Sequence, residues 1–351
     1  MAVGRALYLI ADNTVVRCDL DSWSISWALP LHEPYGLAGK QESEWVAVST
    51  LDGVVALGAN GGIVMRAEGR LRGTDGPTEL ALSGDTLVAQ TNSIHAAPSW
   101  LVGRDRTGDL LWEAGPLDGT ATAPVIVGDE VVHVVSIGSV LREVGEVRAY
   151  ETRTGKLSWR RRVRAQPVLG DRVAQLDGWL VYGPDDDLDP ARDDEVLWID
   201  VRGRRVFPSR IADGGSPLGP PIAGDGMVVF LRQYGDHDGL VAVDANTRNE
   251  KWRVSLHGSM TSNAAAIHEG NVYLRVSTVG KSHRPGDGAQ NELLVLAGSS
   301  GELVGRFRGC HSLSFQVAPI PTPRGVIVVC EEGHLLLCPD APGPGTGARE
   351  Q

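Results

Sequence analysis

A unit of four short strands, repeated along the chain, is the feature that most constrains how this sequence can fold. Residues 124–159 and 221–252 show the unit most clearly: each starts at a proline, passes a Gly-Asp turn between two apolar runs, and ends at a tryptophan. Val, Ile and Leu alternate with polar residues, and the runs stop at glycine-rich turns, which is typical of strands rather than helices. Four strands in a period of about 47 residues predict a propeller blade, because such a sheet buries its faces only against its neighbours.

One position at the end of the fourth strand of each unit allows the blades to be counted. Residues 315–338 then supply three strands of one more blade, and residues 6–29 supply the last three strands of the first blade. We therefore predict an all-β fold, a β-propeller of four-stranded blades with eight blades, the first and last incomplete; seven blades, with the terminal pieces merged, is the alternative. Residues 1–340 are predicted to form a single propeller domain and residues 341–351 a flexible C-terminal tail. The counting positions are Trp27, Met65, Trp112, Trp159, Phe207, Trp252 and the neighbourhood of Arg306.

The turn before the fourth strand carries a motif. Ala149-x-Glu-x-x-Thr-Gly-x-x-x-Trp159 resembles the tryptophan-docking motif of the PQQ-like (quinoprotein alcohol dehydrogenase-like) β-propeller repeats. Residues 242–252 match it, with Arg248 where glycine is usual, and Asp105-Arg-Thr-Gly-x-x-x-Trp112 is one residue shorter. Asp19, Ser22 and Trp27 keep the same spacing near the start of the chain. The resemblance implies the fold of this family, whereas a shared fold does not determine activity.

The tryptophans of the motif are predicted to hold blades together. A large flat ring at the start of an outer strand can lie between adjacent blades and bury roughly 150–250 Å². A neighbouring glycine lets the ring approach the backbone closely. We therefore assign a structural blade-docking role, rather than ligand contact, to Trp27, Trp112, Trp159 and Trp252.

The resemblance also tells which residues a catalytic member would need. Enzymes of the family hold a quinone cofactor above a calcium ion, using a vicinal cysteine pair or an equivalent clamp, acidic and amide calcium ligands, and a catalytic aspartate. Here Cys18, Cys310, Cys330 and Cys338 are widely spaced, so we expect reduced thiols and neither a zinc site nor a disulfide framework. The hydrolase and phosphate-loop motifs are also missing. We predict no catalytic residue, no cofactor and no metal.

Acidic residues concentrate between residues 185 and 195. Asp185, Asp187 and Asp189 alternate as calcium ligands do, but Pro190 stands where such a loop needs glycine. A solvated loop and a partner-binding acidic lip both remain open, and Asp236-His-Asp238 occupies the same connection one blade on. The candidate partner contacts are Asp185, Asp186, Asp187, Asp189, Asp193, Asp194, Glu195, Asp236 and Asp238, with Tyr234 as an apolar anchor.

The connections between the second and third strands are unequal in length. Tight turns are expected in blades one, two and eight, and extended connections in blades three to seven. Repeat proteins often bind on the face that takes such insertions, although neutral drift of surface loops is the other explanation. The basic run at 160–164 is either a solvated connection or a contact for an acidic partner. The extended connections are predicted at 92–98, 138–145, 183–195, 233–239 and 280–291.

Charge and hydropathy narrow the function. A net charge of −11 and a pI of about 5.3 disfavour nucleic-acid and anionic-membrane binding, and no apolar run is long enough to span a membrane. Because residues 1–10 run directly into a strand-like segment without a secretory signal, we expect a cytoplasmic protein.

The function predicted from these features is a non-catalytic protein-interaction scaffold in a bacterial multi-component cytosolic system, with partners bound on the face of the extended connections. By resemblance alone, an AAA+ ATPase or a von Willebrand A-type protein is the expected partner. The alternative is a small-molecule- or sugar-binding propeller, or a quinoprotein-type enzyme, with its site in the axial channel. Small apolar first strands, as in Pro124-Val-Ile-Val127, favour the scaffold.

Overall fold

A computed structural model describes most of the chain, and the regular elements in its described part are all β-strands. No helix there has the length and apolar character that a membrane crossing requires. The predicted tail at 341–351 lies outside the described residues. The ranges that are not described are 40–44, 69–77, 92–98, 118–119, 138–143, 165–172, 184–194, 212–214, 236, 257–259, 261–264, 279–289, 308–317, 331–334 and 339–351.

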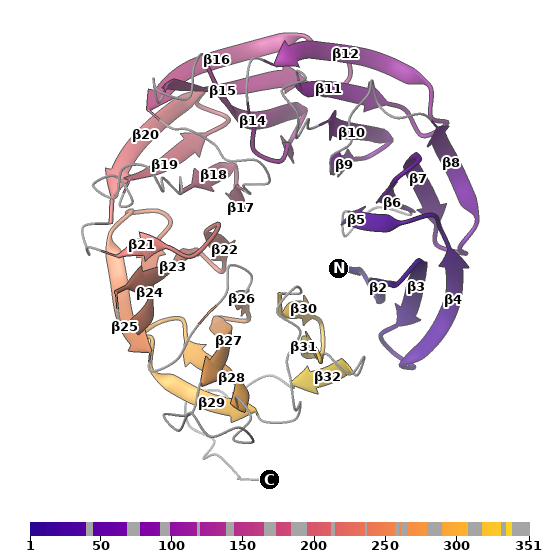
Figure 1. The fold of residues 1–351 in the computed structure, drawn as a ribbon. Coiled ribbons are helices and arrows are strands. Elements are labelled where there is room, and N and C mark those ends of the chain that lie inside the picture. Colours follow the sequence, from indigo (N-terminus) through magenta and orange to yellow (C-terminus); the bar gives the residue numbers. More distant parts are fainter. Residues whose placement is uncertain are drawn as a thin grey trace. The chain divides into compact units, whose positions relative to one another are not determined.

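The chain divides into two compact units, residues 1–173 with 199–206, and residues 174–198 with 207–351. The first unit contains blades 1 to 4, each an antiparallel sheet whose four strands follow chain order (Figure 1). Its strands are β1 (Ala2–Val3), β2 (Ala6–Ala11), β3 (Thr14–Asp19), β4 (Ser24–Pro30), β5 (Pro34–Ala38), β6 (Trp45–Thr50), β7 (Gly53–Gly58), β8 (Ile63–Glu68), β9 (Thr78–Ser83), β10 (Thr86–Thr91), β11 (Ser99–Arg104), β12 (Leu110–Leu117), β13 (Val125–Val127), β14 (Glu130–Ser136), β15 (Val144–Glu151) and β16 (Leu157–Arg164).

Blade 5 contributes residues to both units, and blades 6 to 8 belong to the second. Blade 6 has a divided first strand, because β21 and β22 both pair with β23. Blade 8 has three described strands. The strands are β17 (Ala174–Leu176), β18 (Trp179–Tyr182), β19 (Glu195–Asp200), β20 (Arg205–Arg210), β21 (Ser216–Pro217), β22 (Ile222–Gly224), β23 (Met227–Tyr234), β24 (His237–Asp244), β25 (Glu250–Leu256), β26 (Ala265–His268), β27 (Asn271–Thr278), β28 (Gln290–Ala297), β29 (Leu303–Phe307), β30 (Ile320–Thr322), β31 (Gly325–Val329) and β32 (Leu335–Cys338).

This arrangement confirms the predicted all-β propeller with eight blades and corrects two details. The first blade is complete, because Ala2 pairs with Leu7 and Val3 with Ala6. The counting position is the third or fourth residue of the fourth strand rather than its end, as Trp112 in β12 illustrates.

The middle strands of the blades form the core. All residues of β6 and of β7 are buried, so both faces of that sheet are covered. Val46 and Val48 of blade 2 pack in one cluster with Tyr8 and Val15 of blade 1, and similar clusters join blades 3 and 4 and blades 6 and 7. Burial of apolar surface between consecutive blades is therefore a main source of stability.

Candidate interaction surface

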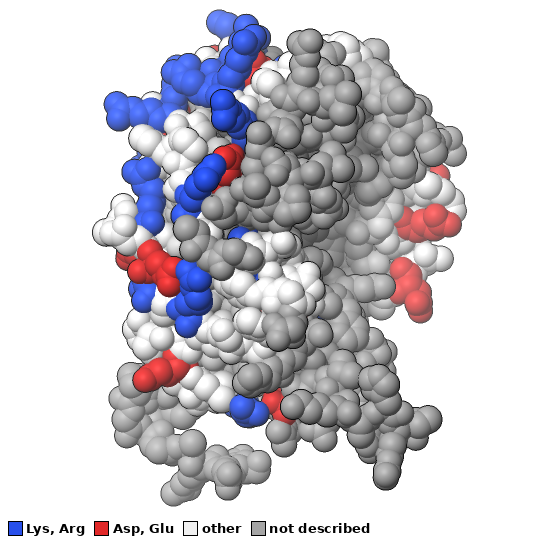
Figure 2. Space-filling model, turned by 60° about the vertical axis from the view of Figure 1, so that its left-hand side comes forward, with Lys and Arg blue, Asp and Glu red and all other residues white. Residues whose placement is uncertain are grey.

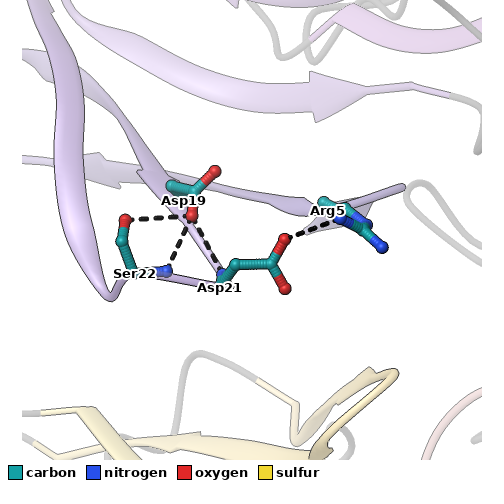
Figure 3. A network of polar contacts seen from close by, with 4 residues as sticks. All are labelled: Arg5, Asp19, Asp21 and Ser22. Carbon is teal, nitrogen blue, oxygen red and sulfur yellow. Dashed lines mark hydrogen bonds and ion pairs between the residues drawn. The ribbon is translucent and has the colours of Figure 1, made fainter.

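The turn between the third and fourth strands of blade 1 is closed by a single carboxylate (Figure 3). Asp19 Oδ1 accepts hydrogen bonds from the backbone N–H of Asp21 (2.9 Å) and of Ser22 (2.8 Å), and from the Ser22 hydroxyl (3.0 Å). Asp21 in turn lies 3.0 Å from the Arg5 guanidinium. The hydrogen bonds from Ser22 hold the pKa of Asp19 below its ordinary value, because they favour the charged carboxylate.

Two other blades build the same turn. Asp105 Oδ1 accepts from the Thr107 hydroxyl at 2.6 Å, and Asp244 Oδ1 accepts from the Thr247 backbone N–H at 2.8 Å. Hydrogen bonds from these threonines likewise lower the pKa of Asp105 and of Asp244. The acidic and hydroxyl residues of the motif thus close the turn rather than contact a ligand.

The tryptophan of one blade docks on the turn of the next. Trp112 Nε1 donates to the Thr152 carbonyl at 2.7 Å. Gly155 has a φ of +64°, and a Cβ there would lie 2.5 Å from the Trp112 ring, so the site needs glycine for both conformation and space. Trp27 donates to the Ala59 carbonyl at 3.0 Å and Trp252 to the Gly298 carbonyl at 2.8 Å, at the same point of the following turns.

The docking changes character where blade 4 meets the turn of blade 5. Trp159 Nε1 donates to Glu130 Oε2 of its own sheet at 2.9 Å, and the Ser158 hydroxyl donates to Glu130 Oε1. Arg204, which occupies the glycine position of the motif with a φ of 55°, donates to Ser158 Oγ at 3.2 Å and lies 3.5 Å from Glu130. A polar cluster therefore replaces the indole–glycine contact.

A second departure follows one blade on. Arg248 also occupies the glycine position, with a φ of 60°, and its guanidinium carbon lies 4.5 Å from the centre of the Phe207 ring and 5.3 Å from that of Trp179. Arginine stacked on aromatic rings contributes about 0.5–2 kcal/mol. In the sequence, the only indication of this contact was that Arg248 stands where the motif usually has glycine.

The acidic lip is mostly outside the described residues, and its described members are not free. Glu195 begins β19 and lies 3.2 Å from the Arg210 guanidinium. Asp238 is buried, and its Oδ2 accepts a hydrogen bond from the Met260 N–H at 2.6 Å. The prediction of Asp238 as an exposed contact is therefore wrong, because its charge is used to hold the backbone. The residues that the structure does not describe are Asp185, Asp186, Asp187, Asp189, Asp193, Asp194 and Asp236.

Tyr234 corrects the expected loop of blade 6. It ends β23 as the register partner of His237, and the two side chains stack with ring centres 5.2 Å apart. The connection is therefore only residues 235–236, with Gly235 at a φ of 60°, instead of the extended 233–239. In blades 3, 4, 5 and 7 the strand bounds do leave long connections, at 92–98, 137–143, 183–194 and 279–289.

Glutamates at the starts of the third strands were missed by the sequence analysis. Glu146 lies 2.8 Å from Arg148, and Glu292 lies 3.2 Å from Arg306, as Glu195 does from Arg210. Both Glu146 and Glu292 are buried. Three of the four blades with long connections thus carry a glutamate beside an arginine within the first three residues of the third strand. In β19 and β28 the arginine lies on the neighbouring strand, whereas Arg148 lies on β15 together with Glu146. The only indication of these ion pairs in the sequence was a glutamate that recurs near the start of the third strands.

Buried His133 lies between blades 3 and 4. Its Nδ1 is 3.4 Å from Gln90 Oε1, and its ring meets the edge of Tyr150. Burial, assisted by the positive charge of Arg148, lowers the pKa of His133 to about 3. The imidazole is therefore neutral, in keeping with a structural role.

A pocket lined by residues of blades 1 and 2 has a volume of about 210 Å³, below the roughly 300–1,000 Å³ of ordinary ligand pockets. His32 Nδ1 and Asp52 Oδ2 lie 2.9 Å apart at this pocket, and both side chains are exposed. Thr50, also in its lining, donates its hydroxyl to the Gly53 carbonyl at 3.2 Å. The polar groups of the pocket thus largely satisfy one another.

Cysteine chemistry departs from expectation. Cys330 is disulfide-bonded, so the expectation of reduced thiols throughout is wrong; Cys18 and Cys338 are free. Burial raises the pKa of the Cys338 thiol to about 12. The cytoplasmic location stays a prediction. Within the described ranges, no group of three His, Cys, Asp or Glu residues is arranged to hold a metal ion.

Comparison with known proteins identifies solved structures that have a similar fold. No protein-family model and no curated protein matches the chain. Among solved structures, BamB from Moraxella catarrhalis has a TM-score of 0.65 at 17% identity, covering 95% of this chain and 91% of that one. The computationally designed Ika8 protein has a TM-score of 0.66 at 18% identity, covering 95% and 93%. The quinohemoprotein alcohol dehydrogenase ADHIIG from Pseudomonas putida HK5 has a TM-score of 0.63 at 12% identity, covering 93% and 68%.

The likeness is one of fold. The chain is a β-propeller with eight blades, a fold that it shares with BamB and with the quinohemoprotein alcohol dehydrogenase. Because a dehydrogenase and a designed protein share this fold, the fold does not decide whether this chain is catalytic.

Proposed function

We propose that this propeller is a non-catalytic protein-interaction scaffold that binds partners through the long connections between its second and third strands. The supporting observation is the contrast in those connections. Blades 3, 4, 5 and 7 insert 92–98, 137–143, 183–194 and 279–289, whereas blades 1, 2 and 6 turn within 12–13, 51–52 and 235–236. The fold does not require the insertions, since three blades form without them.

The bases of the connections support this function. The Glu292–Arg306 ion pair links the third residue of β28 to β29, and the Glu195–Arg210 ion pair links the first residue of β19 to β20. Variable loops on a rigid scaffold are the usual arrangement for recognition. Asp185, Asp186, Asp187, Asp189, Asp193 and Asp194 would give the connection of blade 5 a strongly negative charge. The proposed partner is therefore a protein with a basic surface. The resemblance of the repeat alone suggests that this partner is an AAA+ ATPase or a von Willebrand A-type protein in a bacterial multi-component system.

Site-specific photocrosslinking in the native host tests the proposal. A photoreactive residue at Leu188, in the acidic connection, should capture a specific protein. The same residue at Leu51, in the tight turn of blade 2, should not. Equal capture at both positions, or capture at neither, would contradict the proposal.

Association kinetics with the purified partner then test the charge. The variant D185N/D186N/D187N/D193N/D194N should slow association about tenfold and flatten its salt dependence, because long-range attraction sets the on-rate. A control variant with the same charge change at exposed sites, D12N/D21N/D52N/D85N/D109N, should stay close to wild type. Equal slowing by both variants would show a general effect of net charge.

A further inference from the structure

The outer strand of blade 4 is densely basic in an acidic protein. Arg160, Arg161, Arg162 and Arg164 of β16 are all exposed, in a chain of net charge −11. Figure 2 shows basic side chains crowded at the top of the view, the height at which Figure 1 draws β16. Such crowding is electrostatically unfavourable in the isolated protein, because like charges repel.

No carboxylate of the described residues pairs with these arginines. Within the described residues, the polar contact that they make is internal, from Arg161 Nη1 to the Arg160 carbonyl at 3.1 Å. Other arginines of the chain behave differently, since Arg148, Arg210 and Arg306 each lie within 3.2 Å of a glutamate oxygen. The arginines of β16 are therefore available to an external anion.

The other blades show that the fold does not need this charge. Charged residues on an edge strand can protect it from aggregation. However, β4 and β12 occupy the same outer position without any basic residue, and β4 leaves Ile25 66% exposed. Because equivalent strands of the same molecule form without basic residues, folding does not require the arginines of β16.

The basic surface extends onto the turn of blade 5, in the same compact unit. Arg204 of that turn donates to Ser158 of β16 at 3.2 Å, which places its exposed neighbours beside the strand. We call this surface the basic strip. It consists of Arg160, Arg161, Arg162, Arg164, Arg202 and Arg205.

We propose that the basic strip and the open edge of β16 bind an extended acidic segment of another protein. Among the described strands β16 pairs with β15 alone, so its outer edge can add a strand. Alternate residues of a strand lie about 6.6–6.8 Å apart on one face. Arg160, Arg162 and Arg164 would therefore meet carboxylates at every second position of an added strand.

Apolar and aromatic residues favour a polypeptide over a nucleic acid. Leu157 at the start of β16 is 41% exposed and Val144, paired with Arg164, is 36% exposed, so each end of the strand offers an apolar contact. The aromatic residue of β16, Trp159, is buried, and it offers no surface on which bases could stack. The basic strip is distinct from the acidic connection of blade 5. It would bind an acidic partner, whereas the acidic connection would bind a basic one.

Fluorescence anisotropy with synthetic probes tests the proposal on the full chain. The probe is a labelled 12-residue peptide in which glutamate alternates with valine or threonine. It should bind wild type, and R160S/R162S/R164S should weaken binding about tenfold, because three exposed ion pairs are lost. A control with the same charge change, R5S/R106S/R253S, should bind within about twofold of wild type, and circular dichroism verifies that both variants are folded.

Two further probes separate the alternatives. A peptide N-methylated at alternate residues, which cannot pair with a strand edge, should bind at least about fivefold more weakly than its unmethylated form if the strand is added. Equal loss in both arginine variants, or no difference on methylation, would overturn the proposal. Tighter binding of a single-stranded DNA of equal charge would also overturn it, in favour of nucleic acid.

Discussion

Truncation of Trp112 should reveal how much one docking contact stabilises the propeller. The indole is buried, its N–H donates to the Thr152 carbonyl at 2.7 Å, and its ring lies against Gly155. Removal of a buried aromatic side chain costs about 3–5 kcal/mol, and the carbonyl left without its donor costs about 1 kcal/mol more. We expect Trp112→Ala to lower the free energy of unfolding by about 4–6 kcal/mol, a large share of the 5–15 kcal/mol of a typical domain.

Urea denaturation followed by far-ultraviolet circular dichroism measures this loss without relying on tryptophan emission. Trp112→Phe keeps most of the apolar volume and loses the donor, so it should cost only about 1–2 kcal/mol. Trp23→Ala is the matched control, because Trp23 is 40% exposed and its removal should cost no more than about 0.5 kcal/mol. A midpoint for Trp112→Ala as close to wild type as that of Trp23→Ala would refute the assignment of Trp112 as a docking residue.

Three further predictions concern blades 3 and 4. Gly155→Ala should cost at least about 2 kcal/mol by urea denaturation, because φ is +64° and the new Cβ would lie 2.5 Å from the Trp112 ring; a neutral result would contradict the close contact. His133 stays neutral when folded, with its pKa lowered to about 3 from 6.5, so stability should fall as pH drops through this window by up to about 1.4 kcal/mol per unit. His133→Gln should flatten that dependence, and an unchanged slope would assign it to other groups. The pKa of Asp105 is lowered in the folded protein. Its carboxylate therefore stabilises the fold at pH values above the ordinary aspartate pKa of about 3.9, and this contribution is lost as the pH falls through the lowered pKa. Thermal unfolding of Asp105→Asn should show a lower midpoint than wild type at pH 7 and a smaller further decrease in acid.

The sequence predicted the strands because their signals are local. Gly-Asp turns, alternating Val and Ile, and tryptophans at a regular period each mark an element by themselves. The short strand at Ala2–Val3 was missed because two residues cannot show alternation. The connection of blade 6 was predicted too long because Gly235 and its acidic neighbours have a loop composition, whereas the stacking of Tyr234 on His237 extends both strands.

The site was less predictable because its contacts are not local. Asp238 is charged, and exposure is the usual state of such a residue; its burial depends on the Met260 N–H, 22 residues later. Glu292 and Arg306 meet across neighbouring strands, and no spacing rule announces the pair. Arg248 was visible as a departure from the motif, but its contact with Phe207 requires two blades to be placed side by side.

Successive departures from the repeat occur in the turns of blades 5 and 6. Arg204 and Arg248 replace the glycines of two successive turns, and Phe207 replaces the tryptophan between them. Four arginines crowd β16, and the acidic connection lies in the blade that follows. A repeat protein needs only its docking contacts to fold, so neutral change should scatter departures over all blades. Losses of the tryptophan are indeed scattered, with Met65 and the neighbourhood of Arg306 at its position in blades 2 and 7. The arginines of two successive turns differ, because Arg204 and Arg248 each make a specific new contact, as expected where a repeat has been changed for a function. On this reasoning, we expect the basic strip, which lies beside the first of these two turns, to be a surface where the repeat has been modified for recognition.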